Sequence, residues 1–210
     1  MGTMNVRYSE VLDDLRRAYN GGAAVRDAHV KEEWKQRERA AFLERVRAEG
    51  GRRLLEIGAG TGQDSAFFAE QGLDVLATDL SPAMVERCRA KGLTAQVVDF
   101  LHLDMPDASF DAAYALNCLL HVPNTDLPDV LASVHRVLRP GGLFFVAVYG
   151  GDGTEGPLET DDHVPPRFFS LRTDEQLQDF GGRDFDVEDF HLIGDGPFRK
   201  QVMILRRRLA

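Results

Sequence analysis

The sequence has few cysteines, no surplus of basic residues and no long apolar run. Its 210 residues include only two cysteines, Cys88 and Cys118, too few for a disulfide framework and without the paired spacing of a zinc site. Lys and Arg number 25 against 34 Asp and Glu, whereas proteins that neutralise many phosphates are usually basic on at least one face. The longest strongly apolar run, residues 143–149, is far shorter than the ~20 residues that span a bilayer. We therefore expect a cytoplasmic protein, monomer or homodimer, that binds no metal, nucleic acid or membrane.

The chain does have the composition and periodicity of a globular α/β domain. Hydrophobic residues make up 43% of it and charged residues 28%, enough to build a real core. Short apolar runs rich in β-branched and aromatic residues alternate with helix-like segments of ten or more residues, which predicts a doubly wound, mostly parallel sheet. The predicted strands are residues 53–57, 74–78, 95–98, 110–116 and 142–149.

Two amphipathic helical patterns precede this alternation. The first is expected to end at Asn20-Gly21-Gly22, and the second places Val30 and Trp34 on one face. Tyr19 and Trp34 are interpreted as the apolar stripe that packs these helices on the sheet. We expect residues 1–51 to form an N-terminal helical cap or lid, and residues 52–210 to form the ligand-binding core of a single structural domain.

The last third of the chain differs in character. Residues 150–166 are rich in Gly, Pro, Asp and Glu and are predicted to form a long loop, which in a compact domain is often a functional lid. Residues 185–193 and 198–208 are predicted strands, joined by a tight antiparallel return at residues 194–197.

The glycine-rich segment at residues 54–62 is the most informative part of the sequence. It reads as a buried strand that runs into Gly58, Gly60 and Gly62 and then into a helix. Glycines there let the backbone turn sharply and let a flat ligand approach the main chain. Asp79 ends the next predicted strand, 17 residues beyond Gly62, where a carboxylate accepts hydrogen bonds from a ribose diol. Together these residues indicate an adenosine site.

The glycine spacing distinguishes between two adenosine cofactors. The dinucleotide fingerprint is G-x-G-x-x-G, whereas here the glycines alternate strictly. Glu56, on the strand itself, would repel a pyrophosphate but attract the ammonium group of an amino acid. S-adenosylmethionine is therefore favoured over NAD, and an NAD-dependent oxidoreductase is the less favoured alternative.

With these residues in place, the sequence resembles the class I S-adenosylmethionine-dependent methyltransferases over roughly residues 52–207. The resemblance rests on residues 54–62, Asp79, the pair Asp99-Phe100, the fourth strand at 110–116 and the turn at 138–143. It implies a Rossmann-like, seven-stranded sheet with an antiparallel last strand. It also implies S-adenosyl-L-methionine as methyl donor and S-adenosyl-L-homocysteine as product.

The same resemblance implies roles for individual residues. Asp79 is expected to bind both ribose hydroxyls, Asp99 to accept from the adenine amine, and Glu56 to attract the amino group of the cofactor. Leu80 and Met84 are expected to form apolar walls around the adenine, with core packing as the alternative for Met84. The full set expected to bind the cofactor is Glu56, Gly58, Ala59, Gly60, Gly62, Asp79, Leu80, Met84, Asp99, Phe100 and Asn117.

The acceptor side of the site is expected near residues 117–123 and the end of the fifth strand. Methyl transfer requires the acceptor atom to be held ~3–3.5 Å from the donor carbon, and a general base is needed when the acceptor is a hydroxyl. His121 is the candidate base because histidine titrates near neutral pH, with orientation of its loop as the alternative. Tyr149 is the second candidate catalytic residue, since open α/β sheets bind ligands at the carboxyl ends of their strands.

The expected acceptor is an oxygen or nitrogen atom of a small molecule. Enzymes that methylate amino groups of nucleic acid bases often carry an Asn/Asp-Pro-Pro-aromatic motif after the fourth strand, and only Asn117 matches it here. A non-catalytic protein that binds S-adenosylmethionine as a sensor or partner subunit is the alternative, because the glycine loop and the acids fit both.

Overall fold

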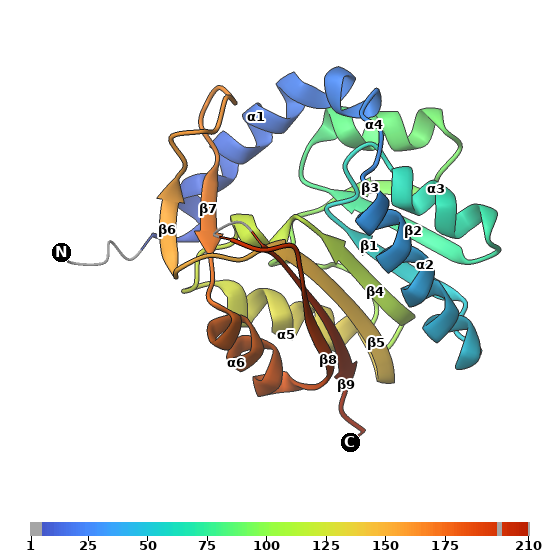
Figure 1. Ribbon diagram of the computed structural model, residues 1–210. Helices are drawn as coiled ribbons and strands as arrows, with labels where there is room; N and C mark the ends of the chain where they lie inside the picture. Colours follow the sequence, from blue (N-terminus) through green and yellow to red (C-terminus); the bar gives the residue numbers. More distant parts are fainter. Residues whose placement is uncertain (1–5, 197–198, 210) are drawn as a thin grey trace.

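A seven-stranded sheet forms the centre of the protein, and the computed structural model describes it within residues 6–196 and 199–209 (Figure 1). The strand order is β3-β2-β1-β4-β5-β9-β8. Strands β1 to β5 pair in parallel, and β9 is antiparallel to both β5 and β8. The predicted Rossmann-like sheet with an antiparallel last strand is thus confirmed, while residues 197 and 198 of the predicted return lie outside the described residues. The strands are β1 (Arg53–Ile57), β2 (Asp74–Asp79), β3 (Ala95–Val97), β4 (Phe110–Leu116), β5 (Leu138–Tyr149), β8 (Phe185–Ile193) and β9 (Lys200–Arg207).

Helices cover both faces of this sheet. Successive side chains of a strand point to opposite faces, so Ala112 and Tyr114 of β4 belong to one apolar cluster and Ala113 and Ala115 to another. The first cluster includes α2 and α3, and the second includes α5 and α6. No helix in the described part of the chain is long and apolar enough to cross a bilayer. The helices are α1 (Tyr8–Asp27), α2 (Glu33–Ala48), α3 (Gln63–Glu70), α4 (Pro82–Ala90), α5 (Leu127–Val137) and α6 (Asp174–Asp184), with a short 3-10 helix, η1 (Leu119–His121).

Helix α2 packs on the sheet as part of its core. The ring of Phe42 lies 5.8 Å from that of Tyr114 and 5.5 Å from that of Phe145, measured between centroids. Trp34 is buried in the same cluster, so its predicted packing role is confirmed. Val30 precedes the helix and is 84% exposed, so its predicted place on the packed face is wrong.

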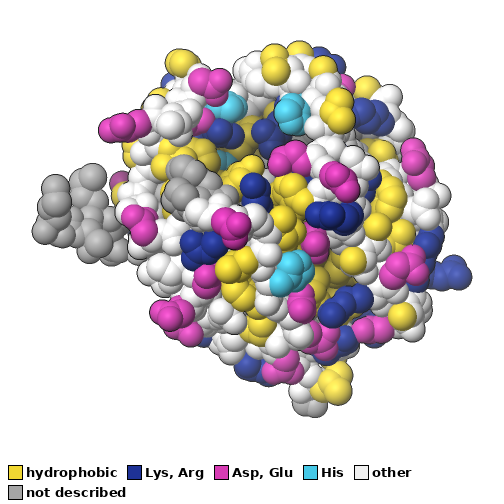
Figure 2. Space-filling view, viewed as in Figure 1, with side chains coloured by type: hydrophobic (Ala, Val, Ile, Leu, Met, Phe, Trp, Pro, Cys, Tyr) yellow, Lys and Arg dark blue, Asp and Glu magenta, His cyan; other side chains and the backbone are white. Residues whose placement is uncertain are grey.

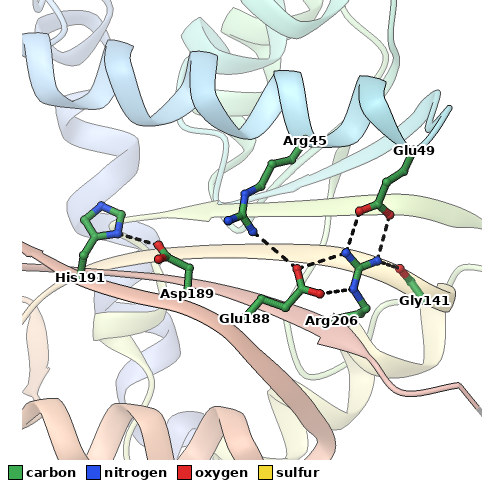
Figure 3. Close-up of polar contacts among 7 residues, drawn as sticks. All are labelled: Arg45, Glu49, Gly141, Glu188, Asp189, His191 and Arg206. Carbon is green, nitrogen blue, oxygen red and sulfur yellow. Dashed lines mark hydrogen bonds and ion pairs between the residues drawn. The ribbon is translucent and has the colours of Figure 1, made fainter.

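A network of ion pairs fixes the end of α2 to the β8–β9 hairpin (Figure 3). The guanidinium group of Arg206 donates to both carboxylate oxygens of Glu49, at 2.9 and 2.6 Å, and to the carbonyl of Gly141 at 2.8 Å. It also donates to Glu188, which in turn pairs with Arg45 of α2 at 3.5 Å. Bidentate and networked pairs hold geometry better than isolated surface pairs, so this network orients α2.

Helix α1 lies above the carboxyl edge of the sheet. It runs from the strand pair β6 (Thr154–Pro157) and β7 (Phe168–Leu171) to α4 (Figure 1). It continues to Asp27, so the predicted end at Asn20-Gly21-Gly22 is wrong. Glycine weakens a helix by only about 1 kcal/mol, and tertiary contacts on both sides of the pair offset that loss. Asn20 accepts a hydrogen bond from the Ser81 hydroxyl at 2.6 Å, and Ala23 is buried.

The segment predicted as a long loop contains a strand. Strand β6 (Thr154–Pro157) pairs with β7 (Phe168–Leu171) in a separate antiparallel sheet of two strands. The prediction for residues 150–166 is therefore wrong at this strand. We call residues 150–171 the lid, because they face α1 across the edge of the main sheet.

Candidate functional site

A cleft of about 740 Å³ opens between the carboxyl edge of the sheet, α1 and the lid. Its size falls within the range of small-molecule sites, and its place at the ends of the parallel strands is where open α/β sheets bind ligands. Figure 2 shows this face hollowed, with histidine and basic side chains near the hollow. The positively charged and histidine side chains that line the cleft include Arg26, Lys31, His121, His163 and Arg167.

The glycine loop forms the floor of the cleft. Gly58, Gly60 and Gly62 have φ values of 66°, 56° and 81°, which disfavour any side chain. A Cβ at Gly58 would lie 2.4 Å from Cβ of Cys118, and one at Gly62 would lie 2.7 Å from Cδ1 of Leu93. At Gly60 the nearest atom, Nε of Arg26, would be 3.8 Å away, which is an ordinary van der Waals contact, so only the positive φ disfavours a side chain there.

The three glycines therefore have different positions relative to the cleft. Gly58, Ala59 and Gly60 line it, as expected. Gly62 caps the N-terminus of α3 and faces the packed side chains of Cys88 and Leu93, so it is absent from the lining of the cleft.

Asp79 braces the loop and faces a smaller cavity that adjoins the cleft. Its Oδ2 accepts from the amide of Gly60 at 2.8 Å, and its Oδ1 accepts from the amide of Ser81 at 2.8 Å. Burial raises the pKa of this carboxyl group. Each oxygen keeps a further lone pair, and Leu80 and Phe100 line the same cavity. The structure thus brings together three of the residues expected around the adenosine.

Two other residues expected around the adenine differ from that set. Met84 is fully buried and lines the large cleft, so it takes part in both the core and the cleft wall. Asp99 is absent from the linings of the cleft and of the adjoining cavity. Its Oδ1 accepts from the amide of Leu101 at 3.0 Å, and its side chain is 24% exposed. Asp99 thus precedes the cavity-lining Phe100 without lining the cavity itself.

Glu56 lies at the buried end of the cleft. It accepts a hydrogen bond from the Ser65 hydroxyl. Burial and the neighbouring carboxylate of Asp64 raise the pKa of Glu56 to about 8, while Lys31 and Arg39 form ion pairs with Asp64. A cationic amino group beside Glu56 would stabilise its charged form and lower that pKa again.

Asn117 offers a second acceptor at the same end. It follows β4 with φ of 54°, and its backbone N–H donates to the backbone carbonyl of Ala147 at 2.7 Å. Its Oδ1 is buried without a hydrogen-bond partner among the described residues, although buried acceptors are rarely left unpaired. An ammonium group between Glu56 and Asn117, and a ribose diol on Asp79, would satisfy these oxygens. The residues present therefore fit S-adenosylmethionine.

His121, Tyr19 and Arg167 form a hydrogen-bonded group in the lining of the cleft, and Tyr19 and His121 also line the smaller cavity beside Asp79. Nε2 of His121 lies 2.5 Å from the hydroxyl of Tyr19, and Nδ1 lies 2.6 Å from the carbonyl oxygen of Phe168. Arg167 donates to the Tyr19 hydroxyl at 3.1 Å and is held by Asp161 at 2.7 Å. Burial lowers the pKa of His121 to about 3.

These contacts change the interpretation of two predicted residues. Both ring nitrogens of His121 are engaged, so the predicted direct contact with an acceptor is not available to it in this arrangement. Tyr19 packs against the main core cluster, as interpreted, and in addition it lines the cleft and binds His121 through its hydroxyl. Tyr149 lies at the end of β5 in the cleft wall, where it was expected.

Arg26 and Arg167 are cleft residues that the sequence did not reveal. The guanidinium groups of Arg26 and Arg167 lie 5.6 and 5.4 Å from the centroid of the Tyr19 ring. Tyr19, Gly22 and Arg26 follow one another at spacings of three and four, which places them on one face of a helix. That spacing was the available signal for Arg26, whereas nothing near Arg167 in sequence indicated its partner.

Comparisons with known proteins agree with this geometry. Residues 55–146 match the family model described as a methyltransferase domain. The chain is 32% identical over 146 residues to the methyltransferase GfsG of Streptomyces halstedii, covering 65% of this chain and 51% of that protein. It is 39% identical over 116 residues to 24-methylenesterol C-methyltransferase 2 of Oryza sativa subsp. japonica, covering 51% and 31%. The chain thus spans about a third to a half of the length of these relatives.

A solved structure matches nearly the whole chain. It is 1,6-didemethyltoxoflavin-N1-methyltransferase of Burkholderia thailandensis, with bound 1,6-didemethyltoxoflavin and S-adenosylhomocysteine. The TM-score is 0.76 at 25% identity, and the match covers 99% of this chain and 93% of the other. The comparisons thus favour a methyl donor over the dinucleotide alternative.

Proposed function

Because the chain belongs to the class I S-adenosylmethionine-dependent methyltransferases, we propose that it transfers the methyl group to an oxygen or nitrogen atom of a small, flat molecule. When bound, the cofactor supplies an electrophilic methyl group on a sulfonium centre. The observation that carries the proposal is that the cleft and its adjoining cavity bring together two sets of residues with different chemistry. One set comprises the glycine loop and the acceptor oxygens, and the other comprises aromatic rings and a histidine.

The first set of residues is proposed to bind and orient the cofactor. Asp79 is the proposed acceptor for the ribose hydroxyls, and Glu56 and Asn117 are the proposed acceptors for the ammonium group. Gly58, Ala59 and Gly60 supply backbone atoms to the lining of the cleft.

The second set of residues forms the proposed slot for the acceptor. Tyr149 at the end of β5, Phe169 of the lid and Tyr19 of α1 supply aromatic rings to the lining of the cleft. Aromatic rings stack well on flat molecules and shield a cationic methyl group from water. The relative of known structure has a heteroaromatic acceptor bound, which is consistent with a slot of this kind.

Two measurements test the proposal. Calorimetric titration with S-adenosylhomocysteine is expected to show binding at a single site, and absence of binding would refute the assignment to cofactor chemistry. Incubation with S-adenosylmethionine and a panel of phenols, ring N–H heterocycles and aliphatic amines is then followed by release of S-adenosylhomocysteine. Release that depends on a flat member of the panel supports a small-molecule methyltransferase, whereas binding without turnover of any member favours a non-catalytic role.

A further inference from the structure

The Tyr19 hydroxyl lies between a base and a cation inside the cleft. Tyr19 comes from α1, His121 from η1 and Arg167 from the lid, so the three elements that enclose the acceptor side meet at one phenol oxygen. Arg167 is itself held by the buried carboxylate of Asp161, and the Tyr19 ring lies 5.6 Å from that of His121. Tyr19 and His121 line both the cleft and the smaller cavity beside Asp79.

The direction of the hydrogen bonds follows from what each group is able to donate. The carbonyl of Phe168 only accepts, so Nδ1 of His121 carries the ring proton and Nε2 presents its lone pair. Tyr19 therefore donates its hydroxyl proton to Nε2. A hydroxyl has two lone pairs, and Arg167 uses one of those on Tyr19, so the second is left for a donor in the cleft.

We propose that Tyr19 is a catalytic residue whose hydroxyl oxygen contacts the methyl acceptor and takes a proton from its O–H or ring N–H group, while His121 receives the proton that Tyr19 gives up. This inference rests on the proposed function and narrows its acceptor to an atom that carries a hydrogen. As the bond from the methyl carbon to the acceptor forms, the bond from carbon to sulfur breaks and sulfur keeps the electron pair. The proton of the acceptor then moves to Tyr19, and the former hydroxyl proton of Tyr19 moves to Nε2 of His121.

The surroundings of the pair suit this sequence of events. Burial raises the pKa of Tyr19, so the hydroxyl is protonated and ready to donate before the reaction. Arg167 and Arg26 lie beside the ring and stabilise negative charge on it. Burial lowers the pKa of His121, so Nε2 is unprotonated before the reaction and is able to accept a proton.

The arrangement of protons on His121 is testable without any acceptor. In the complex with S-adenosylhomocysteine, nitrogen NMR of histidine-labelled protein is expected to show His121 neutral with its proton on Nδ1 at neutral pH. The His121→Gln variant identifies the signal, and Tyr19→Phe is expected to shift the Nε2 resonance. A proton on Nε2, or a charged ring at neutral pH, would overturn the proposal, because no lone pair would then face Tyr19.

Kinetics separate proton transfer from mere packing. The probes are 8-hydroxyquinoline and lumazine, which carry an O–H and ring N–H groups, and thiophenol, which attacks as a thiolate and has no proton to lose. Tyr19→Phe is expected to lower kcat for the first two probes by at least about 100-fold, the usual size of general base catalysis, and to change the thiophenol rate by less than about 3-fold. Equal losses for all three probes, or no loss for any, would overturn the proposal.

Two further variants complete the design. His121→Gln keeps a donor for Phe168 and an acceptor for Tyr19 but has no basic nitrogen, so kcat for the proton-bearing probes is expected to fall at unchanged KM. A structural role for His121 predicts wild-type kcat in that variant. Tyr114→Phe removes a buried hydroxyl outside the cleft and is the matched control. Failure of S-adenosylhomocysteine to bind the wild type would instead count against the proposed function as a whole.

Discussion

Substitution of Asp79 by alanine is expected to weaken both the fold and the binding of the cofactor, by amounts that are separable. In the protein alone, the carboxylate accepts one hydrogen bond from Gly60 and one from Ser81, each 2.8 Å long. Loss of an acceptor from a buried amide costs about 1–3 kcal/mol, and relief of the buried charge offsets part of the sum. We therefore expect the free energy of unfolding to fall by roughly 2–3 kcal/mol.

The effect on the cofactor is expected to be larger. Two charge-assisted hydrogen bonds to ribose hydroxyls are worth about 1.5–3 kcal/mol each, so the affinity for S-adenosylhomocysteine should fall by about 10²–10⁴-fold. Urea unfolding measures the first quantity, and calorimetric titration under conditions where the variant is folded measures the second. Asp79→Asn keeps one acceptor oxygen and is expected to show smaller losses in both.

The control is Asp74→Ala at the other end of the same strand. Its side chain is 79% exposed and 4.0 Å from Arg53, so this variant should bind S-adenosylhomocysteine with unchanged affinity. An Asp79→Ala variant that is destabilised but binds S-adenosylhomocysteine as tightly as wild type would refute the reasoning. Asp79 would then be only a brace of the glycine loop, and the ribose would have to lie elsewhere.

Three further predictions concern the scaffold around the site. Arg172 is fully buried and donates to three acceptor oxygens, so Arg172→Met is expected to lower the free energy of unfolding by about 3 kcal/mol in urea, and a loss below about 1 kcal/mol would contradict this. Gly58→Ala should lower the melting temperature severely, because its Cβ would meet a side-chain carbon at 2.4 Å, whereas Gly60→Ala should mainly weaken binding of S-adenosylhomocysteine. The side chain of His191 is 40% exposed. Partial burial lowers its pKa, but Asp189 and Glu38 raise it by more, so the net shift of the pKa is upward. The stabilising contribution of His191 should be present below about pH 6.5 and should be lost as the pH rises through the raised pKa. His191→Gln should therefore destabilise the protein by under about 1 kcal/mol at low pH and by less at high pH. Urea unfolding of the wild type and the variant in parallel at both pH values measures this difference.

The main sheet and the glycine loop were predictable because their signals are local. The central parallel strands β1, β4 and β5 are short runs of mostly apolar residues buried on both faces, and such runs stand out from the amphipathic helices between them. The loop after β1 requires glycine at fixed positions, since φ is positive at Gly58 and Gly60. A single sequence therefore contains enough information for a mostly parallel, doubly wound sheet to be expected and for a ligand to be placed at its glycine loop.

Elements that depend on distant contacts were not predictable in the same way. The Gly21-Gly22 pair is a reasonable helix end in isolation, but α1 continues because its face is held against α4 and the sheet edge. Strand β6 has the sequence Thr-Glu-Gly-Pro, which has little intrinsic tendency to form a strand. It is extended because it pairs with β7, whose residues follow more than ten positions later.

The hydrogen-bonded group of Tyr19, His121 and Arg167 is the clearest case of a site assembled from distant residues. Tyr19 and His121 are 102 positions apart, and Tyr19 and Arg167 are 148 positions apart. Each residue alone has an ordinary explanation, since a tyrosine on an apolar helix face packs and an arginine in a polar loop is solvated. The hydrogen bonds among the three residues show more than packing and solvation. A phenol, an imidazole and a guanidinium group are buried at one point at low cost only when their donors and acceptors match. Among these three side chains, one lone pair remains unused, on the hydroxyl oxygen of Tyr19. In the proposed mechanism it is this oxygen, and not a nitrogen of His121, that contacts the acceptor.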